Sequence, residues 1–275
     1  MPSILDTILA HKRETELPKR IKAVSPTEMR RLAETLINPT LDFAAHLRHR
    51  AGNLGLIAEV KRASPSRGDL VRGDFDPVGL ATIYEQNGAS AISVLTDERF
   101  FRGSLTYLTS IKKAVSIPVL RKDFVIDSYQ LYEARAAGAD AVLLIVAALE
   151  NGLLRELHET ARGLSLAALV EVHDEIETER ALDIGARIIG VNNRDLRAFV
   201  TDISTTAHCA SLMPAGTLLV SESGIFTAAD AQKVASMGAQ AILVGESIIT
   251  SSDIAAQVRL LSSVHIPSSQ TKGGL

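Results

Sequence analysis

The chain has 275 residues, of which 46% are hydrophobic and 22% charged. This is the composition of a globular protein, so intrinsic disorder and collagen-like repeats are excluded. The 29 basic and 32 acidic residues give a formal net charge of −3, which excludes the strong positive field that attracts nucleic acid or an anionic membrane.

Cysteine content and hydrophobic runs bear on the compartment. The single cysteine, Cys209, excludes an internal disulfide framework and a cysteine-built zinc site, and it suits a reducing environment. The longest apolar run, 141–149, is too short to span a bilayer. Asp6 interrupts the apolar stretch at the N-terminus, and no small-residue cleavage site follows it, so we predict no signal peptide. We therefore expect a cytoplasmic protein with no membrane or nucleic-acid partner.

The first 50 residues are predicted to be helical. Apolar residues at positions 4, 5, 8 and 9 recur at helical spacing after a cap residue, Ser3. Ser25 followed by Pro26 predicts a second helix that runs to about position 36. Asp42 predicts the start of a third helix through position 47. We interpret residues 1–50 as a helical extension that packs against the rest of the chain.

From position 56 onward, short apolar runs alternate with amphipathic segments. The predicted strands are 56–60, 91–95, 118–120, 141–145, 167–172, 188–191, 218–220 and 241–244. The predicted helices are 77–87, 105–114, 128–137, 153–162, 175–182, 203–210, 228–237 and 253–261. Near-continuous Val, Ile and Leu runs are typical of strands buried on both faces, and hence of a parallel sheet.

Eight strand–helix units in about 220 residues match the size of a (β/α)₈ barrel. A doubly wound open sheet is the competing fold, but no Gly-x-Gly-x-x-Gly follows the first strand, which weakens its dinucleotide-binding version. Gly-Ala pairs at 88, 138, 185 and 238 suit helix ends followed by tight turns. We predict one barrel domain over 1–275, with a loose tail at 268–275.

Polar residues follow all but one of the predicted strands. In chain order they are Glu59, Lys61 and Ser64; Thr96 and Asp97; Arg121, Lys122 and Asp123; Glu171; Asn192, Asn193 and Arg194; Glu222; and Gly245, Glu246 and Ser247. A barrel builds its chemistry at the carboxyl ends of its strands. One charge beside buried Ile and Val is most often a structural ion pair, but so many at one rim predict a site.

The charges in this set are balanced. Lys61, Lys122 and Arg194 oppose three carboxylates, from Glu59, Glu171 and Glu222. Opposite charges at close range shift pKa values in opposite directions, which suits acid–base catalysis.

The last two loops predict a phosphate site. Ser223-Gly224 follows the seventh strand and Gly245-Glu246 follows the eighth, where barrels often bind phosphate through backbone N–H groups. Ser64 in the first loop adds a hydroxyl. A Ser-Gly pair alone is most often only a turn, so the prediction depends on its placement. The carboxylate of Glu246 fits such a site only if its side chain turns away from the anion.

Six segments of the chain resemble the indole-3-glycerol-phosphate synthases of tryptophan biosynthesis. They are IAEVKRASPS at 57–66, LTDERFFRGS at 95–104, LRKDF at 120–124, LVEVH at 169–173, GVNNRDL at 190–196 and SESGI at 221–225. The resemblance extends from the N-terminal helices through the eighth strand. The chain departs from the family pattern at 248–250, Ile-Ile-Thr, where a Met-Arg-like sequence is expected, and this puts a basic residue near the phosphate rim in doubt.

The resemblance implies a carbon–carbon lyase, a carboxy-lyase. Its substrate would be 1-(2-carboxyphenylamino)-1-deoxyribulose 5-phosphate, which loses carbon dioxide and water as the pyrrole ring closes. Lys122 would be the general acid of ring closure. Glu171, Lys61 and Glu59 would divide the proton transfers of dehydration in a way the sequence leaves open. No metal or organic cofactor is implied.

The resemblance also implies binding roles. Asn192 and Arg194 would hold the sugar hydroxyls or the carboxylate, and Glu222 would orient a lysine or bind a hydroxyl. The aryl ring would lie in an apolar slot, and the phosphate would bind at the last two loops. The slot is formed by Phe101, Phe124 and Leu196, and the phosphate residues are Ser64, Ser223, Gly224, Gly245 and Glu246. Docking to other tryptophan-pathway enzymes and the oligomeric state are open.

Two other functions compete with this prediction. One is another phosphosugar barrel, such as phosphoribosylanthranilate isomerase, but that isomerase needs a Cys/Asp-type acid–base pair at strands one and five. The other is a catalytically silent barrel that binds phosphorylated ligands, which would be expected to lose lysines or glutamates from the rim. His158, His173 and His208 show no metal-ligand spacing, so we interpret them as structural, and Cys209 as a packing residue.

Overall fold

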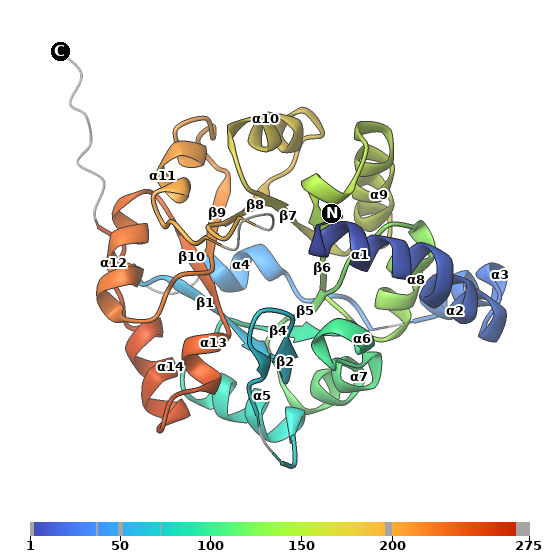
Figure 1. The fold of residues 1–275 in the computed structure, drawn as a ribbon, viewed down its shortest axis with the longest axis horizontal. Coiled ribbons are helices and arrows are strands. Elements are labelled where there is room, and N and C mark those ends of the chain that lie inside the picture. The colour runs from blue at the N-terminus through green and yellow to red at the C-terminus, as the bar shows by residue number, and fades with distance from the viewer. Residues whose placement is uncertain (1–2, 37, 49–51, 72, 196–199, 268–275) are drawn as a thin grey trace.

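The computed structural model describes residues 3–36, 38–48, 52–71, 73–195 and 200–267. Within these ranges, eight parallel strands form a closed barrel in the order β1-β10-β9-β8-β7-β6-β5-β4 (Figure 1). The strands are β1 (Gly55–Val60), β4 (Ala91–Leu95), β5 (Val119–Lys122), β6 (Ala141–Ile145), β7 (Ala167–Val172), β8 (Ile188–Asn192), β9 (Leu218–Glu222) and β10 (Ala241–Val244). The predicted fold class, a (β/α)₈ barrel, is confirmed.

Each barrel strand is followed by a helix on the outside of the sheet. These helices are α5 (Pro77–Gln86), α7 (Leu105–Ala114), α8 (Ser128–Ala136), α9 (Asn151–Gly163), α10 (Glu175–Asp183), α11 (Thr205–Ala210), α12 (Ala228–Ser236) and α14 (Ile254–Ser262). The predicted Gly-Ala turns are confirmed. At the first of them Gly88 has φ +107° and the Ala89 N–H donates to the Tyr84 carbonyl, which ends α5 in a Schellman turn.

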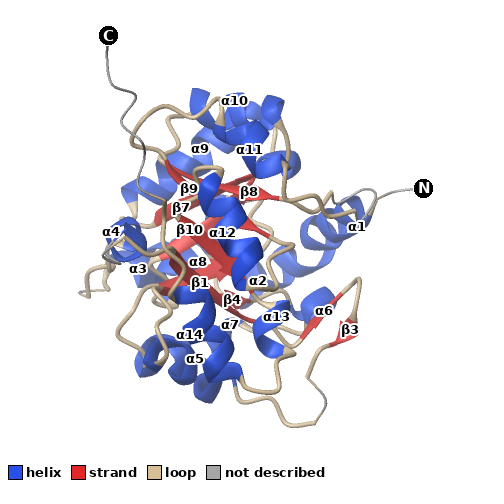
Figure 2. Cartoon of the chain, turned by 90° about the vertical axis from the view of Figure 1, so that its left-hand side faces the viewer, coloured by secondary structure: helices blue, strands red, loops and turns tan. Residues whose placement is uncertain are grey.

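Short elements that the apolar pattern did not predict lie in the loops after the strands. An antiparallel pair, β2 (Ala63–Ser64) and β3 (Gly68–Asp69), follows β1. The short helices are α6 (Glu98–Phe101) after β4 and α13 (Glu246–Ile249) after β10, and a 3₁₀ turn (Val146–Ala148) follows β6. In the side view of Figure 2, β3, α6 and α13 lie toward one end of the barrel and α4 lies toward the other.

The extension is helical, as predicted, and a larger part of it is helical than the sequence pattern indicated. It consists of α1 (Ile4–His11), a π-helical segment (Lys12–Glu16), α2 (Leu17–Ala23), α3 (Pro26–Glu34) and α4 (Phe43–Arg48). Ser3 caps α1 in a capping box with Asp6, and the Ser25 side chain caps α3. The segment 12–23 was missed because its charged residues hide the helical period, although they are the residues that anchor the extension.

Lys12 fixes the extension to the barrel. Its side chain is 1% exposed, and its ammonium lies 2.7 Å from Asp123, 3.0 Å from Asp97 and 2.8 Å from Glu16. Asp123 and Asp97 follow β5 and β4 directly and are fully buried. Arg121 and Arg20 continue the network through Glu133 of α8. Buried charges are tolerated only when paired in this way, so the extension supplies a cation that the barrel requires.

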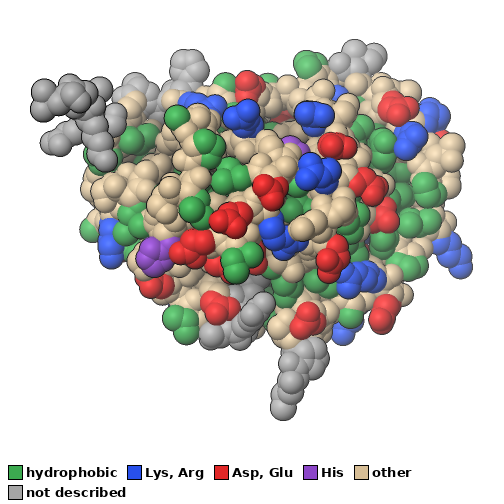
Figure 3. Space-filling model, turned by 90° about the horizontal axis from the view of Figure 1, so that it is seen from above, with side chains coloured by type: hydrophobic (Ala, Val, Ile, Leu, Met, Phe, Trp, Pro, Cys, Tyr) green, Lys and Arg blue, Asp and Glu red, His purple; other side chains and the backbone are tan. Residues whose placement is uncertain are grey.

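The surface carries no large area of one charge sign on the flank seen in Figure 3, where acidic, basic and hydrophobic side chains are interspersed. This matches the formal net charge of −3. Within the described ranges, no helix is both long and apolar enough to cross a membrane. Cys209 is buried and unpaired, in agreement with its predicted packing role.

Removing the Lys12 charge should destabilise the fold. In Lys12→Met, Asp97 and Asp123 lose a buried cation, which typically costs about 3–5 kcal/mol of unfolding free energy. Urea denaturation measures the loss. The matched control is Arg31→Met, which breaks the exposed Arg31–Glu28 pair at 2.6 Å and should leave stability unchanged within error. Equal effects of the two substitutions would contradict the anchoring role of Lys12.

Candidate active site

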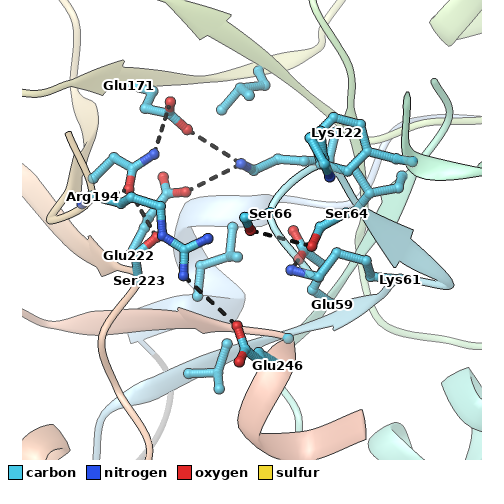
Figure 4. A pocket seen from close by; sticks show the side chains of 18 of the residues that line it. Glu59, Lys61, Ser64, Ser66, Lys122, Glu171, Arg194, Glu222, Ser223 and Glu246 are labelled. Atoms are coloured by element: carbon cyan, nitrogen blue, oxygen red, sulfur yellow. Dashed lines mark hydrogen bonds and ion pairs between the residues drawn. The ribbon is translucent and has the colours of Figure 1, made fainter. Parts of the chain in front are cut away.

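One cavity gathers the predicted site residues (Figure 4). It opens at the carboxyl ends of the strands, and every described residue that was assigned a catalytic or binding role lines it, whereas Thr96, Asp97, Arg121 and Asn193 of the predicted rim do not. The lining residues with an assigned role are Glu59, Lys61, Ser64, Phe101, Lys122, Phe124, Glu171, Asn192, Arg194, Glu222, Ser223, Gly224, Gly245 and Glu246. Leu196 lies outside the described residues. The strands also extend beyond the predicted apolar runs, because β5, β8 and β9 continue into Lys122, Asn192 and Glu222.

Lys122 of β5 lies between two carboxylates from two other strands of the barrel. Its ammonium is 3.2 Å from Glu171 of β7 and 3.4 Å from Glu222 of β9. Both glutamates are 2% exposed and Lys122 is 15% exposed. The closed sheet produces this meeting, since residues on β5, β7 and β9 point inward at the same end of the barrel.

Burial and the shared ammonium give the two carboxyl groups different pKa values. Burial raises the pKa of Glu222 to about 8, and the negative charges of Glu171 and Glu59 add to this rise against the opposing effect of Lys122. Burial also acts to raise the pKa of Glu171, but Lys122 and His173 hold it below its ordinary value. Burial alone would lower the pKa of Lys122, but three carboxylates raise it instead. At neutral pH the site therefore holds an ammonium, a carboxylate and a neutral carboxylic acid in contact.

Glu59 and Lys61 form a second pair at the end of β1. They are two residues apart, so both point into the barrel, and the Lys61 Nζ lies 2.7 Å from the Glu59 Oε1. Burial acts to raise the pKa of Glu59, but Lys61 and Lys122 bring it below the ordinary value. Glu59 is therefore ionised and orients the Lys61 ammonium at the cavity wall.

Two glycines leave room for these carboxylates. A Cβ at Gly190 would lie 2.2 Å from Glu222 Oε1, and a Cβ at Gly245 would lie 2.6 Å from Glu59 Oε1. A side chain at either glycine would force the facing carboxylate out of its position. Gly245, predicted as a phosphate ligand, thus has a packing role that the sequence did not reveal.

Asn192 connects the acid–base residues to the phosphate rim. Its Nδ2 donates to Glu171 Oε1 at 3.3 Å, and its Oδ1 accepts from the Ser223 hydroxyl at 2.8 Å and from the Arg194 N–H at 3.1 Å. Ser223 and Gly224 both have positive φ, +65° and +78°. A non-glycine residue in this region is strained, which is a common feature of binding loops.

Glu246 does not turn away from the rim. Its carboxylate lies 2.9 Å from the Arg67 guanidinium and 3.7 Å from that of Arg194. Figure 4 shows the side chain directed toward Arg194 across the cavity. The predicted phosphate site therefore contains a carboxylate that is itself held by two cations.

An apolar region lies on the other side of the cavity. The rings of Phe101 and Phe124 are 6.0 Å apart between centroids and inclined by 36°. Ile4, Leu5 and Ile8 of α1 line the same cavity. The apolar residues of α1 were predicted to pack, with a role over the ligand left open, because nothing in their spacing distinguishes packing from lining a pocket.

His173 is a further residue whose place the sequence analysis missed. Its Nε2 lies 3.5 Å from Glu171 and has no hydrogen-bond partner, although it is buried. Its position two residues after Glu171 was the available signal, because it predicts the same face of the strand. His158 and His208 lie on α9 and α11. Among the described residues, no three His, Cys, Asp or Glu side chains gather as metal ligands.

Comparison with known proteins identifies the family. A family model described as indole-3-glycerol phosphate synthase matches residues 5–261. The chain is 54% identical over 270 residues to the indole-3-glycerol phosphate synthase of Roseiflexus sp., covering 95% of this chain and 98% of that protein. The chain belongs to the indole-3-glycerol phosphate synthase family.

Other relatives agree with this family. The indole-3-glycerol phosphate synthase of Chloroherpeton thalassium is 50% identical, with 92% of this chain and 96% of that protein covered. The corresponding enzyme of Geobacillus kaustophilus is 49% identical over 252 residues, 91% of this chain and 93% of that protein. The sequence prediction of an indole-3-glycerol phosphate synthase, a carboxy-lyase of tryptophan biosynthesis, is confirmed. The alternatives of an isomerase and of a silent barrel are set aside.

Solved structures support the fold alone. A thiamine phosphate pyrophosphorylase from Pyrococcus furiosus aligns with a TM-score of 0.61 at 16% identity, over 81% of this chain and 97% of that chain. A 3-hexulose-6-phosphate synthase from Salmonella typhimurium aligns with a TM-score of 0.61 at 16% identity, over 77% of this chain and 98% of that chain.

The raised pKa of Glu222 makes stability depend on pH. The folded state binds this proton more tightly than the unfolded state. The resulting stabilisation is complete when the pH is below the ordinary pKa of 4.5, and it is lost as the pH rises through the folded-state pKa of about 8. The free energy of unfolding of Glu222→Gln should therefore rise relative to the native protein across this window. Urea denaturation at several pH values measures the difference. Glu28→Gln, at an exposed site, is the control, and a flat difference for Glu222→Gln would contradict the assigned protonation.

Proposed function

We propose that this cavity binds 1-(2-carboxyphenylamino)-1-deoxyribulose 5-phosphate and converts it to indole-3-glycerol phosphate, carbon dioxide and water. The observation that carries the proposal is the position of Lys122, between Glu171 and Glu222, with an apolar slot on one side and a serine- and glycine-lined rim on the other. This substrate has an aryl ring at one end, a phosphate at the other and the reacting ketone between them.

The two ends of the cavity suit the two ends of the substrate. The anthranilate ring lies against Phe101 and Phe124, where aromatic stacking and burial of apolar surface stabilise it. The phosphate lies at the rim formed by Ser64, Ser223 and the backbone of Gly224 and Gly245. Glycine at these positions lets backbone N–H groups approach phosphate oxygens closely. Arg194 binds the carboxylate or a hydroxyl of the substrate.

Ring closure needs a proton at the ketone oxygen. The aromatic carbon that carries the carboxylate attacks the ketone carbon, and the carbonyl electron pair moves to its oxygen. Lys122 donates its proton to that oxygen. Because three carboxylates raise its pKa, the ammonium keeps its proton until the oxygen develops alkoxide character, when transfer becomes favourable.

Loss of carbon dioxide and water completes the reaction. The carboxylate leaves as carbon dioxide, and its bonding electrons return to the ring. The new hydroxyl then leaves as water with a proton from Lys61, which Glu59 orients. Glu171, which is ionised, accepts the proton that is lost as the pyrrole becomes aromatic. Glu222 carries a proton at pH values below its pKa of about 8, and it hydrogen-bonds a substrate hydroxyl.

Ring closure, decarboxylation and dehydration need no external oxidant or reductant, so the acids and bases of the chain suffice for every step. Decarboxylation and dehydration are bond rearrangements within one substrate. We further propose that residues 1–275 act as one domain, since Lys12 connects the extension to β4 and β5. The cytoplasmic location stays a prediction from the sequence.

The direct test of the proposed function is turnover in the presence of a chelator. The native protein should convert the substrate to a product with indole absorbance and fluorescence. Lys122→Met should lower kcat by roughly 10²–10⁴-fold, the usual contribution of a positioned acid. Lys113→Met, which removes an exposed lysine from α7, is the matched control and should retain native kcat. Near-native activity of Lys122→Met would remove the assigned acid.

Glu246 should weaken binding of phosphate. Its carboxylate faces the same guanidinium groups that an anion would contact, so the two negative charges compete. In Glu246→Gln, inorganic phosphate should become a stronger competitive inhibitor, and the substrate KM should fall severalfold. Steady-state kinetics at several phosphate concentrations measures both. Glu28→Gln is a remote control, and weaker phosphate inhibition in Glu246→Gln would show that phosphate binds elsewhere.

A further inference from the structure

His173 lies beside Glu171 at the carboxyl end of β7 without lining the cavity. The two residues are separated by one position, so their side chains point to the same side of the strand. Nε2 of the imidazole lies 3.5 Å from Glu171 Oε1, and the side chain is 13% exposed. This nitrogen is buried and has no hydrogen-bond partner, and the contact recorded for it is with the carboxylate of a proposed catalytic base.

The other side of the ring is held by α10. Nδ1 of His173 lies 2.9 Å from Glu177 Oε2, and the same oxygen accepts the backbone N–H of His173 at 2.9 Å. The Glu177 N–H in turn donates to Asp174, the residue that caps α10. Nδ1 therefore acts as a donor to a carboxylate, which fixes the ring and directs Nε2 toward Glu171.

The charges around His173 favour an imidazolium. Glu171 on β7, Glu177 on α10 and Glu222 on β9 act on it, whereas Lys122 on β5 contacts the other oxygen of Glu171. Burial lowers the pKa of His173, but the three carboxylates outweigh burial and raise it above the ordinary value. A neutral ring would direct a lone pair at a carboxylate, which is unfavourable.

We propose that His173 is a positioning residue for Glu171. Its imidazolium is a second cation on the carboxylate, opposite Lys122, and it holds Glu171 ionised and oriented toward the substrate. Lys122 and His173 differ in one respect. The ammonium stays charged at any working pH, whereas an imidazole changes charge near neutrality. His173 therefore sets the proton affinity of Glu171 over the pH range in which the enzyme works.

The competing explanation is structural. The ring could serve only to join the end of β7 to α10 through Glu177, with the contact to Glu171 incidental. The two roles use different nitrogens, Nδ1 for Glu177 and Nε2 for Glu171. His173→Asn places an amide nitrogen near the Nδ1 position and so retains the bond to Glu177, while it removes the nitrogen that faces Glu171.

The electrostatic contact is tested by NMR titration of the histidine rings, without reference to activity. His173→Asn assigns the resonance of His173. Coupling is reciprocal, so loss of the Glu171 charge in Glu171→Gln should lower the pKa of His173. Lys122→Met should raise it, because a neighbouring positive charge is removed. The resonance of the exposed His208 is the internal control in both variants. An unchanged pKa of His173 in both folded variants overturns the proposal.

The positioning role is tested by the pH dependence of kcat and rests on the proposed function. Loss of the imidazolium should raise the pKa of Glu171, so kcat of His173→Asn should fall on the acid side, by about threefold or more near pH 5.5, with little change in KM. His173→Gln directs a neutral donor toward Glu171 and should recover part of the loss. His208→Asn is the control.

The outcomes separate the two proposals. A native pH profile in His173→Asn shows a purely structural role and overturns this inference, while the synthase activity of the native protein still stands. Absence of synthase activity in the native protein overturns the proposed function, and the histidine titration then decides whether His173 and Glu171 are coupled.

Discussion

The site depends on one buried ammonium that two carboxylates share. Lys122 balances the charge of Glu171 and contacts Glu222, and without it three buried glutamates would stand close together with only Lys61 and His173 against them. Desolvation of unpaired carboxylates costs several kcal/mol or more each. The closed barrel makes the arrangement possible, because β5, β7 and β9 direct inward residues to the same end. Gly190 and Gly245 then leave the volume that the carboxylates occupy.

A second buried network stabilises the first. Lys122 has charged neighbours on both sides along the chain, Arg121 and Asp123, which pair with each other in a cluster completed by Lys12. The two networks share a strand but not a side chain. The extension is therefore part of the barrel's charge balance, and the same anchoring brings α1 to the cavity, where its apolar residues line the aryl end.

Much of this could be predicted from the sequence, and the exceptions have physical reasons. Alternating apolar runs predicted all eight barrel strands, and the polar residues after them predicted the cavity, because a barrel brings strand ends together. The runs ended too early at Lys122, Asn192 and Glu222, since hydrophobicity does not mark strand residues that serve a site. Lys12 was missed because its partners in the barrel, Asp97 and Asp123, lie 85 or more positions away. His173 was missed because it follows a strand on which Glu171 was already assigned. Charge pairing over such distances, as between Lys12 and Asp97, leaves no local pattern.

The shared cation also explains how one residue type supplies both an acid and a base. Glu171 has Lys122, His173 and Asn192 around its oxygens, and it is ionised. Glu222 has only the longer contact to Lys122, and its second oxygen lies against Gly190 with no hydrogen-bond partner, so it retains a proton. The difference between them arises from the number of donors that each strand end provides. A site that needs both a proton acceptor and a neutral hydrogen-bond donor can thus use chemically identical side chains, provided that their surroundings are unequal.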